Sequence, residues 1–390
     1  MKANVSTQPK TSRKRHGKLK AFVILLFILF ICYLARAVYN FRDDTYDSLD
    51  HTDQTILSEL NTVMSTDTSN TLWKDYDISK KPVLALNGRF GKGYLINPSN
   101  DIHSLFAHEI QMPKGYSVKV YRISPMAPSL LQFAAAGNFN TLHKSYNVYG
   151  NSVYFTKYDD SSITQKQSSN HYINFLTHEA FHYYMQNNWS ESGRFNTDSL
   201  SGENLELLGK QYEVLQKIYD VLIADQDGQH AAPDKATLQG LAKEYVEATD
   251  NRFQANAKYM KEETQAETEE GTATYVAMNA SKLVGYDFQI MQFADKNDSS
   301  KVTTLPFDAI VPALQNGASD PSIISTDIIY QSGALLCRLL DALEVPDWQQ
   351  TLNQQTKQNP VTLYQILSDY VRQKLCKLLF NSSLWIPGPT

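Results

Sequence analysis

The sequence predicts an α+β fold that is mainly helical, and three observations support this class. Short β-prone runs gather between residues 81 and 167, apolar residues recur three and four apart through most of 168–385, and one uncharged apolar run lies near the N-terminus. The chain has 390 residues, 42% hydrophobic and 20% charged, as is typical of a globular protein with a large core. We therefore expect a small N-terminal β-containing subdomain followed by a helical C-terminal half.

The N-terminus predicts a membrane anchor. Residues 1–20 carry seven Lys/Arg and no acid, and the apolar run AFVILLFILFICYL follows at 21–34. This run is short for a spanning helix, which needs roughly 17–25 residues, unless residues 35–39 extend it past Arg36. A soluble core helix does not stay apolar on every face, so we interpret 21–38 as a single-pass anchor. Residues 1–20 then form a cytoplasmic basic segment, and the body lies outside the cytoplasm.

Cleavage of this segment is the alternative. The ARA at residues 35–37 fits the small-x-small pattern of a signal-peptidase site, which would release a secreted product after Ala37. Cys32 follows Ile31 and not a small residue, which argues against lipoprotein processing.

Charge excludes one class of partner. Without the seven basic residues of the N-terminal segment, 29 basic residues stand against 41 acidic ones, a net charge of −12. An acidic body does not suit a phosphate backbone, so we expect no nucleic-acid partner.

The region before the helical half divides in two. Residues 39–80 are polar with one short amphipathic pattern, TILSELNTVM, and are interpreted as a stalk or a lead-in helix. Residues 81–167 contain β-prone runs such as PVLALNG and NSVYFTKYD, separated by turn residues. The GRFGKG stretch at 88–93 lacks the spacing and the Ser/Thr of a phosphate loop and is interpreted as a turn.

Residues 168–385 are predicted to be helical. The segment DQDGQHAAPDKA at 225–236 separates two helices, and SLWIPGPT at 383–390 ends the chain as an unstructured tail. Cys337 and Cys376 are interpreted as two buried thiols, with a disulfide between them as the alternative. No cysteine pair has the spacing of a thiolate zinc site.

The motif HEAFH begins at His178 and is the main functional signal. Residues four apart share a helical face, so His178 and His182 can direct their nitrogens to one point. Glu179 is rotated away from that direction, yet it can reach a water on a metal held by the two imidazoles. The alternative is a helix with two histidines that only pack or form hydrogen bonds. We expect a zinc site.

A catalytic zinc ion needs a third protein ligand and one open position. The segment KEETQAETEEGTATYVAM at 261–278 is helix-prone and rich in acids, and it becomes small and apolar after Glu270. Gly271 and Ala273 are expected to leave room for a carboxylate that enters a buried face. Glu267 shares a helical face with Glu270, and Glu269 adjoins Glu270. All the acids of this segment except the one ligand are interpreted as a solvated face.

HEAFH followed by EEGTATY resembles the gluzincin metallopeptidases, in which a glutamate on a second helix completes the zinc site. Their E-G-x-A-x-Y pattern is matched here at Glu270, Gly271, Ala273 and Tyr275. The resemblance covers two short motifs and implies a gluzincin-like domain with one zinc ion on His178, His182 and Glu270. Glu269 is the alternative third ligand. Some gluzincins carry an aspartate where this chain has Thr274, so support for the first histidine must come from elsewhere or be weaker.

The resemblance also implies roles for residues outside the two motifs. For Tyr330, in a helical segment downstream, the resemblance implies a role in stabilising the oxyanion, whereas a buried tyrosine bonded to backbone is the commoner arrangement. The strand-like run at 147–159 is expected either to pair with an extended substrate or to form a structural hairpin. His171 is interpreted as surface at a helix start, with a role beside His178 as the alternative, and His103 and His108 as ordinary histidines.

These observations together predict a membrane-anchored, extracytoplasmic zinc peptidase. Glu179 would act as the general base for a metal-activated water that attacks the carbonyl of a peptide or protein substrate. Two alternatives are a gluzincin-like scaffold without catalysis, and a zinc hydrolase of a non-peptide amide or ester of the cell envelope. Oligomeric state and cleavage preference are left open.

Overall fold

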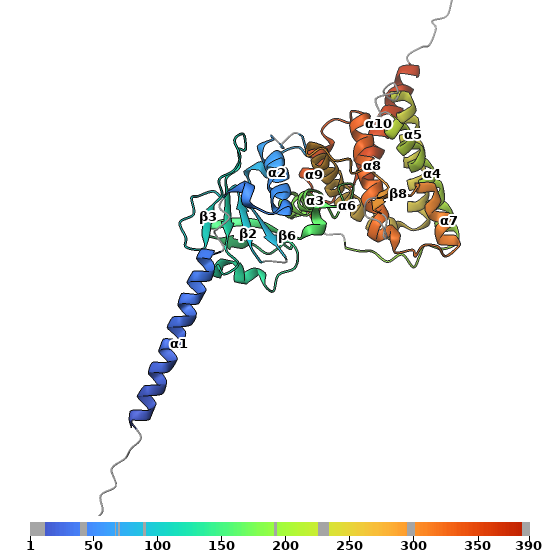
Figure 1. Ribbon diagram of the computed structural model, residues 1–390. Coiled ribbons are helices and arrows are strands. Elements are labelled where there is room, and N and C mark those ends of the chain that lie inside the picture. The colour runs from blue at the N-terminus through green and yellow to red at the C-terminus, as the bar shows by residue number, and fades with distance from the viewer. Residues whose placement is uncertain are drawn as a thin grey trace, which may run out of the picture.

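A computed structural model describes residues 12–39, 45–66, 68, 71–88, 91–190, 193–224, 234–294 and 301–383 (Figure 1). The chain is a mixed α+β protein with 56% helix and one six-stranded sheet, in agreement with the expected class. The sheet lies between the N-terminal helix and the helical half (Figure 1). Most of the basic segment, the middle of the GRFGKG turn and the C-terminal tail fall outside the described residues.

The N-terminal helix α1 (Ser12–Tyr39) projects away from the body. Its Gly17–Tyr39 part is 23 residues long and, among the described residues, is the one helix apolar enough to cross a membrane. Only 6% of its most apolar window is buried inside the protein, so it is not a core helix. This apolar helix fits either a single membrane span or a signal sequence.

Helix α2 (His51–Ser65) belongs to the core and does not form a stalk. Asp50 caps it by accepting a hydrogen bond from the backbone N–H of Asp53. The fully buried Asp53 carboxylate accepts hydrogen bonds of 2.5 Å from the hydroxyls of Tyr94 and Tyr158 on the sheet. These bonds attach the helix to the sheet, so residues 51–65 are part of the β-containing subdomain.

The sheet has the strand order β3-β4-β2-β1-β6-β5, in which only β1 and β6 are parallel. Its strands are β1 (Val83–Asn87), β2 (Gly93–Ile96), β3 (Ala107–Glu109), β4 (Val120–Ile123), β5 (Tyr146–Val148) and β6 (Asn151–Tyr158). Strand β1 is buried along its whole length. Val83 and Ala85 face the large core with the helices, whereas Leu84 and Leu86 face a smaller core below the short helix at Pro128–Phe133.

The helical half contains α3 (Tyr172–Met185), α4 (Glu203–Ala224), α5 (Lys235–Ala255), α6 (Ala257–Leu283), α7 (Ile310–Gln315), α8 (Ile329–Ala342), α9 (Trp348–Asn353) and α10 (Leu363–Ser383). The break between α4 and α5 falls at the predicted segment. A two-stranded hairpin of β7 (Gln292–Ala294) and β8 (Val302–Thr304) interrupts this half and was not expected. Cys337 is a free, buried thiol on α8.

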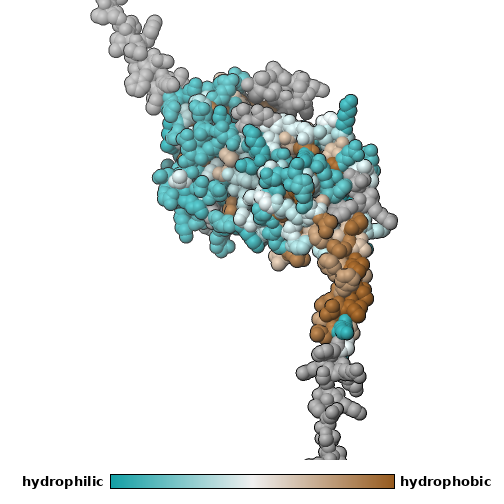
Figure 2. Space-filling view, turned by 90° about the vertical axis from the view of Figure 1, so that its left-hand side faces the viewer, coloured by the Kyte–Doolittle hydropathy of each residue, from teal (hydrophilic) through white to brown (hydrophobic). Residues whose placement is uncertain are grey.

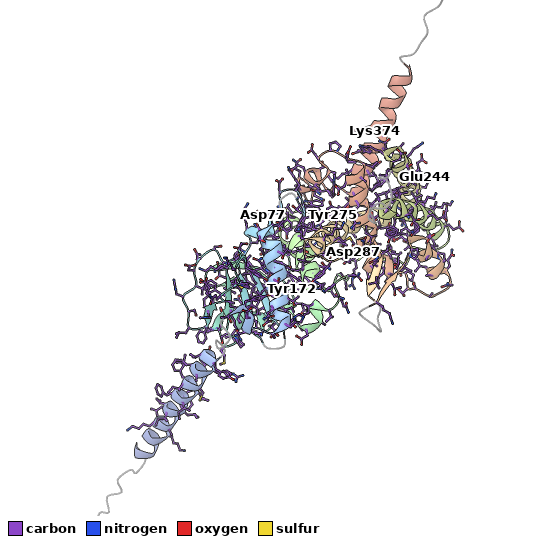
Figure 3. The ribbon with its side chains drawn as sticks, turned by 45° about the horizontal axis from the view of Figure 1, so that its top comes forward. Asp77, Tyr172, Glu244, Tyr275, Asp287 and Lys374 are labelled. Carbon is purple, nitrogen blue, oxygen red and sulfur yellow. The ribbon has the colours of Figure 1, made fainter. Side chains whose placement is uncertain are left out.

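Helix α6 is the centre of this half, since it packs against both α3 and α8. Gly271 on α6 lies directly against Gly333 on α8, and a Cβ on either residue would collide with the backbone of the other helix. The expectation that Gly271 leaves room for a carboxylate is therefore wrong, because a neighbouring helix fills that space. Tyr275, labelled in the interior in Figure 3, donates a 2.6 Å hydrogen bond to Asp341 and also joins the two helices.

Candidate metal centre

Helix α3 presents the two motif histidines from a buried position. Ile173, Leu176 and Ala180 on this helix are fully buried and hold it in the large core. His178 and His182 are each partly accessible on the face that leaves the core, with their Nε2 atoms 3.0 Å apart. The two nitrogens therefore point to one place, as the four-residue spacing requires.

The third group is Glu270 of α6. Its Oε2 atom lies 3.3 Å from Nε2 of His178 and 3.3 Å from Nε2 of His182. Atoms that share one tetrahedral ion at about 2.0–2.1 Å are separated by about 3.3–3.4 Å, so the donor set has the chemistry and nearly the spacing of a zinc site. Among the described residues, His178, His182 and Glu270 are the group of His, Cys, Asp and Glu side chains whose ligand atoms lie close enough to hold a metal.

The other acids of α6 have different surroundings. Glu267 is buried and accepts a hydrogen bond from Ser332 of α8. Glu263 is buried in a two-bond ion pair with Arg252, including an Nη2–Oε2 contact of 2.8 Å. Glu269 is buried beside the centre and lines a cavity next to the histidines. The interpretation of these acids as a solvated face is therefore wrong, because α6 is covered on most of its circumference.

Gln186 is a functional candidate that the sequence analysis missed. It lies one turn after His182, is buried, and its side-chain oxygen Oε1 pairs with Nδ1 of His182. Its amide nitrogen donates to the backbone oxygen of Glu269 at 2.9 Å and to Oγ1 of Thr272 at 2.8 Å. These two donated bonds orient the amide so that Oε1 accepts from Nδ1–H. His182 is then held as the tautomer whose Nε2 lone pair is free for a metal.

Thr274 stands where some gluzincins have an aspartate, and its hydroxyl donates back to the carbonyl of Glu270 at 2.8 Å. In some gluzincins a side chain behind the first histidine holds it in place. In this protein the corresponding contact is made to the second histidine, His182, by Gln186. The i+4 spacing of Gln186 from His182 was visible in the sequence, but its burial was not.

Charge interactions within the triad shift two pKa values. Burial alone would lower the pKa of His182, but the Glu270 carboxylate raises it to about 9. Burial alone would raise the pKa of Glu270, but the charge of His182 and hydrogen bonds from both histidines hold it well below its ordinary value. In the metal-free protein the triad is therefore a carboxylate–imidazolium cluster, in which a proton occupies the place of a cation.

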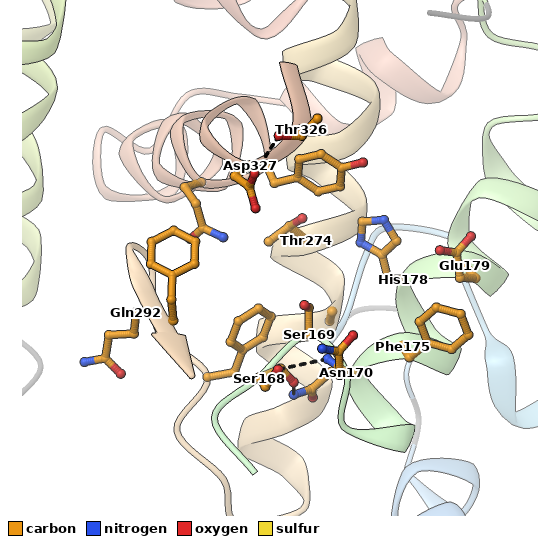
Figure 4. Close-up of a pocket in the computed structure, with 16 residues that line it drawn as sticks. Ser168, Ser169, Asn170, Phe175, His178, Glu179, Thr274, Gln292, Thr326 and Asp327 are labelled. Atoms are coloured by element: carbon orange, nitrogen blue, oxygen red, sulfur yellow. Dashed lines mark hydrogen bonds between the residues drawn. The ribbon is translucent and has the colours of Figure 1, made fainter. Parts of the chain in front are cut away.

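Two cavities meet at His178, Glu179 and Tyr330. One, of about 260 Å³, is lined by His178, Glu179 and Tyr330 together with Phe175 and Asp327. Figure 4 shows the side chains of Asp327, Thr274 and His178 arranged around it. The other cavity, of about 430 Å³, is also lined by His178, Glu179 and Tyr330, and in addition by His182 and the segment Phe139–Leu142. The centre thus lies between two spaces, and Glu179 borders both.

Tyr330 lies at the centre as well. It is placed by a π-helical turn at Ile324–Ile328 that leads directly into α8. Its ring is parallel to the His178 ring, 15° between planes and 5.8 Å between centroids. Burial, and then the Glu270 carboxylate, raise the pKa of Tyr330 and keep it a protonated phenol that can donate a hydrogen bond.

One other expectation is not met, and one open choice between two interpretations is decided. His171 is not at the surface: it is fully buried, precedes the first turn of α3 and packs edge-on against Tyr286, with ring centroids 4.7 Å apart. Strand β6 is not a free edge for a substrate, since β1 and β5 pair with it, and its residue Lys157 donates a 2.7 Å hydrogen bond to the carbonyl of Asn138. The run at 147–159 is the structural hairpin, one of the two interpretations that the sequence left open.

Comparison of the chain with protein-family models, with curated proteins and with solved structures finds no match.

Proposed function

We propose that the protein is a zinc-dependent peptidase of gluzincin-like design. One observation carries the proposal: Nε2 of His178, Nε2 of His182 and Oε2 of Glu270, from two helices far apart in sequence, meet within 3.0–3.3 Å beside Glu179. Zinc held by these three atoms would supply a Lewis acid that lowers the pKa of a water to about 7 and polarises a carbonyl.

The residues around the triad fit hydrolysis of an amide bond. Glu179, which borders both cavities, takes the proton of the attacking water and passes it to the leaving nitrogen. The Tyr330 phenol, parallel to His178, donates a hydrogen bond to the oxygen on which negative charge develops. The two cavities that border His178 and Glu179 offer space for a substrate beside the triad.

The proposed location is a membrane. Helix α1 serves as an anchor with residues 1–20 in the cytoplasm, and the catalytic body lies on the other side. The mass of the mature chain tests this part, since cleavage after Ala37 would remove the anchor and leave a secreted enzyme.

Two substitutions test the chemistry. Glu179→Gln keeps the ligand set and removes the base, so we expect one zinc ion per chain by elemental analysis and a loss of peptide turnover of about 10²–10⁴-fold. Glu270→Ala removes a ligand, so we expect the purified protein to lose its zinc. Undiminished hydrolysis by Glu179→Gln would contradict the mechanism, and zinc retained by Glu270→Ala would contradict the ligand assignment.

A further inference from the structure

Helix α1 is docked onto the body through its last turns. Ala37 is buried, and Tyr33 and Leu34 are half-buried, whereas the large apolar residues from Phe22 to Ile31 are about half exposed. The Tyr33 ring lies 5.4 Å from that of Phe106, and its hydroxyl donates to the carbonyl of Met126. Two loops of the β-containing subdomain therefore lie at the level of Tyr33 along the helix.

The length of α1 gives an estimate of how deep in a bilayer this contact lies. The 23 residues of Gly17–Tyr39 rise about 35 Å at 1.5 Å per residue, slightly more than a hydrocarbon layer of about 30 Å. Tyr33 lies six residues, or about 9 Å, before the end of the helix. With the apolar part centred in the bilayer, Tyr33 sits about 7 Å below the boundary on the side of the body.

The two loops that contact Tyr33 each present a leucine to solvent. Leu105 precedes Phe106 and is 73% exposed; Leu131, in the short helix after Met126, is 72% exposed. Outside α1, the other exposed large hydrophobic side chain among the described residues is Val302, which at 37% is only about half as exposed as the two leucines. Exposed apolar residues of the body thus gather where the anchor meets it, and Figure 2 shows apolar surface continuing from α1 onto the adjoining part of the body.

The surrounding fold holds these leucines outward. Leu130 and Phe133 of the same short helix are buried in the smaller core, which leaves Leu131 on the opposite side. Ala107 and Ile102 flank Leu105 and are buried in that same core. The exposure is therefore a property of two fixed segments.

We propose that Leu105 and Leu131 insert into the bilayer leaflet next to the body, so that the β-containing subdomain rests on the membrane beside α1. The occupant is lipid hydrocarbon, because the apolar surface is continuous with the helix that spans it and lies at the depth that helix sets. This inference rests on the proposed membrane location and is independent of the proposed enzymatic activity. It implies a restricted orientation of the body above the membrane.

Depth-dependent quenching tests the inference in the full-length chain. Leu105→Trp and Leu131→Trp are made separately, reconstituted in nanodiscs with acyl chains that are brominated or not, and compared with the wild type. We expect each added tryptophan to lose fluorescence in brominated lipid. Val302→Trp, on β8 far from α1 (Figure 1), is the matched control and is expected to be unaffected.

Ile28→Trp, on the exposed part of α1, reports separately on the span itself. Quenching at position 28 without extra quenching at 105 and 131, relative to 302, would overturn the inference and leave the anchor standing. If the tryptophan at position 28 is not quenched, the proposed membrane location is contradicted, and the inference with it. If the tryptophans at positions 105 and 131 are shielded from solvent but not quenched by bromine, they are buried against a second copy of the chain. That result would also overturn the inference.

Discussion

At the scale of single residues, the centre depends on a contact behind the proposed metal ligands. Gln186 fixes the His182 ring by accepting from its Nδ1, and two donated bonds hold Gln186 itself. Ligand histidines with such an outer partner lose part of their metal affinity when it is removed. The supporting residue here is the C-cap of α3, one turn after the histidine that it orients.

Gln186→Leu should therefore weaken zinc binding by about 10–100-fold while leaving the fold intact. Competition with a chromophoric chelator measures the affinity. Asn187→Leu, at the exposed neighbouring position, is the matched control and should bind like the wild type. Equal affinities for all three proteins would remove the positioning role from Gln186.

Proton competition at His182 sets a pH dependence. Its pKa in the metal-free protein is about 9, above the 6.5 of a free histidine, so at neutral pH a proton must leave before Nε2 can bind a metal. Zinc affinity should rise about tenfold per pH unit between pH 7 and 9 and flatten above 9, where the proton is already lost. Calorimetric titration in buffers of different ionisation enthalpy counts the released proton. An affinity that does not change between pH 7 and 9 would contradict the carboxylate–imidazolium cluster.

At the scale of secondary-structure elements, the crossing of α6 and α8 positions two parts of the centre. Glu270 precedes Gly271 on α6, and Tyr330 lies one turn before Gly333 on α8. The two glycines let the helix backbones touch, so the crossing fixes the carboxylate relative to the phenol.

Gly333→Ala should destabilise the protein by about 1–3 kcal/mol, because the new methyl group meets the carbonyl of Glu267. Thermal unfolding measures the change. Gly240→Ala, on α5, is the control: nothing lies within 4 Å of the added Cβ, so this change should stabilise by about 0.5–1 kcal/mol. If Gly333→Ala is as stable as the wild type, α6 and α8 can move apart without loss of stability, which would contradict this prediction.

At the scale of the whole molecule, a buried polar cluster joins three elements. Glu59 of α2 accepts a hydrogen bond from Tyr286, which follows α6, and lies 3.7 Å from Nε2 of His171 at the start of α3. Burial raises the pKa of Glu59 to about 7, although the Tyr286 bond opposes the shift. Burial lowers the pKa of His171 to about 4, so this histidine is neutral at physiological pH.

The cluster makes stability depend on pH with a defined sign. The folded-state pKa of Glu59, about 7, exceeds its ordinary 4.5. The contribution of Glu59 to the free energy of unfolding is therefore complete below pH 4.5 and is lost as pH rises through 7. Between pH 5 and 8 the wild type should lose on the order of 2 kcal/mol relative to Glu59→Gln. Chemical denaturation of both proteins without metal measures this difference. Glu206→Gln, at an exposed site on α4, should follow the wild type.

Much of the outline could be predicted from the sequence because it depends on local pattern. The helical half and the β-containing region follow from periods of 3.6 and 2, and the apolar helix from an uninterrupted run of side chains. The convergence of His178 and His182 follows from their spacing on one helix. The expected placement of Glu270 came from a resemblance of motifs, and its distances of 3.3 Å agree with it.

The tertiary structure alone decided what depends on contacts between distant segments. Whether Glu263, Glu267 and His171 are solvated, whether Gly271 borders a carboxylate or a helix, and which residue supports a histidine are set by neighbours far away in the chain. The pairing of both edges of β6 and the docking of α1 at Tyr33 are of the same kind. Periodicity reports which face of an element is apolar, whereas burial, pKa and support depend on what packs against that face.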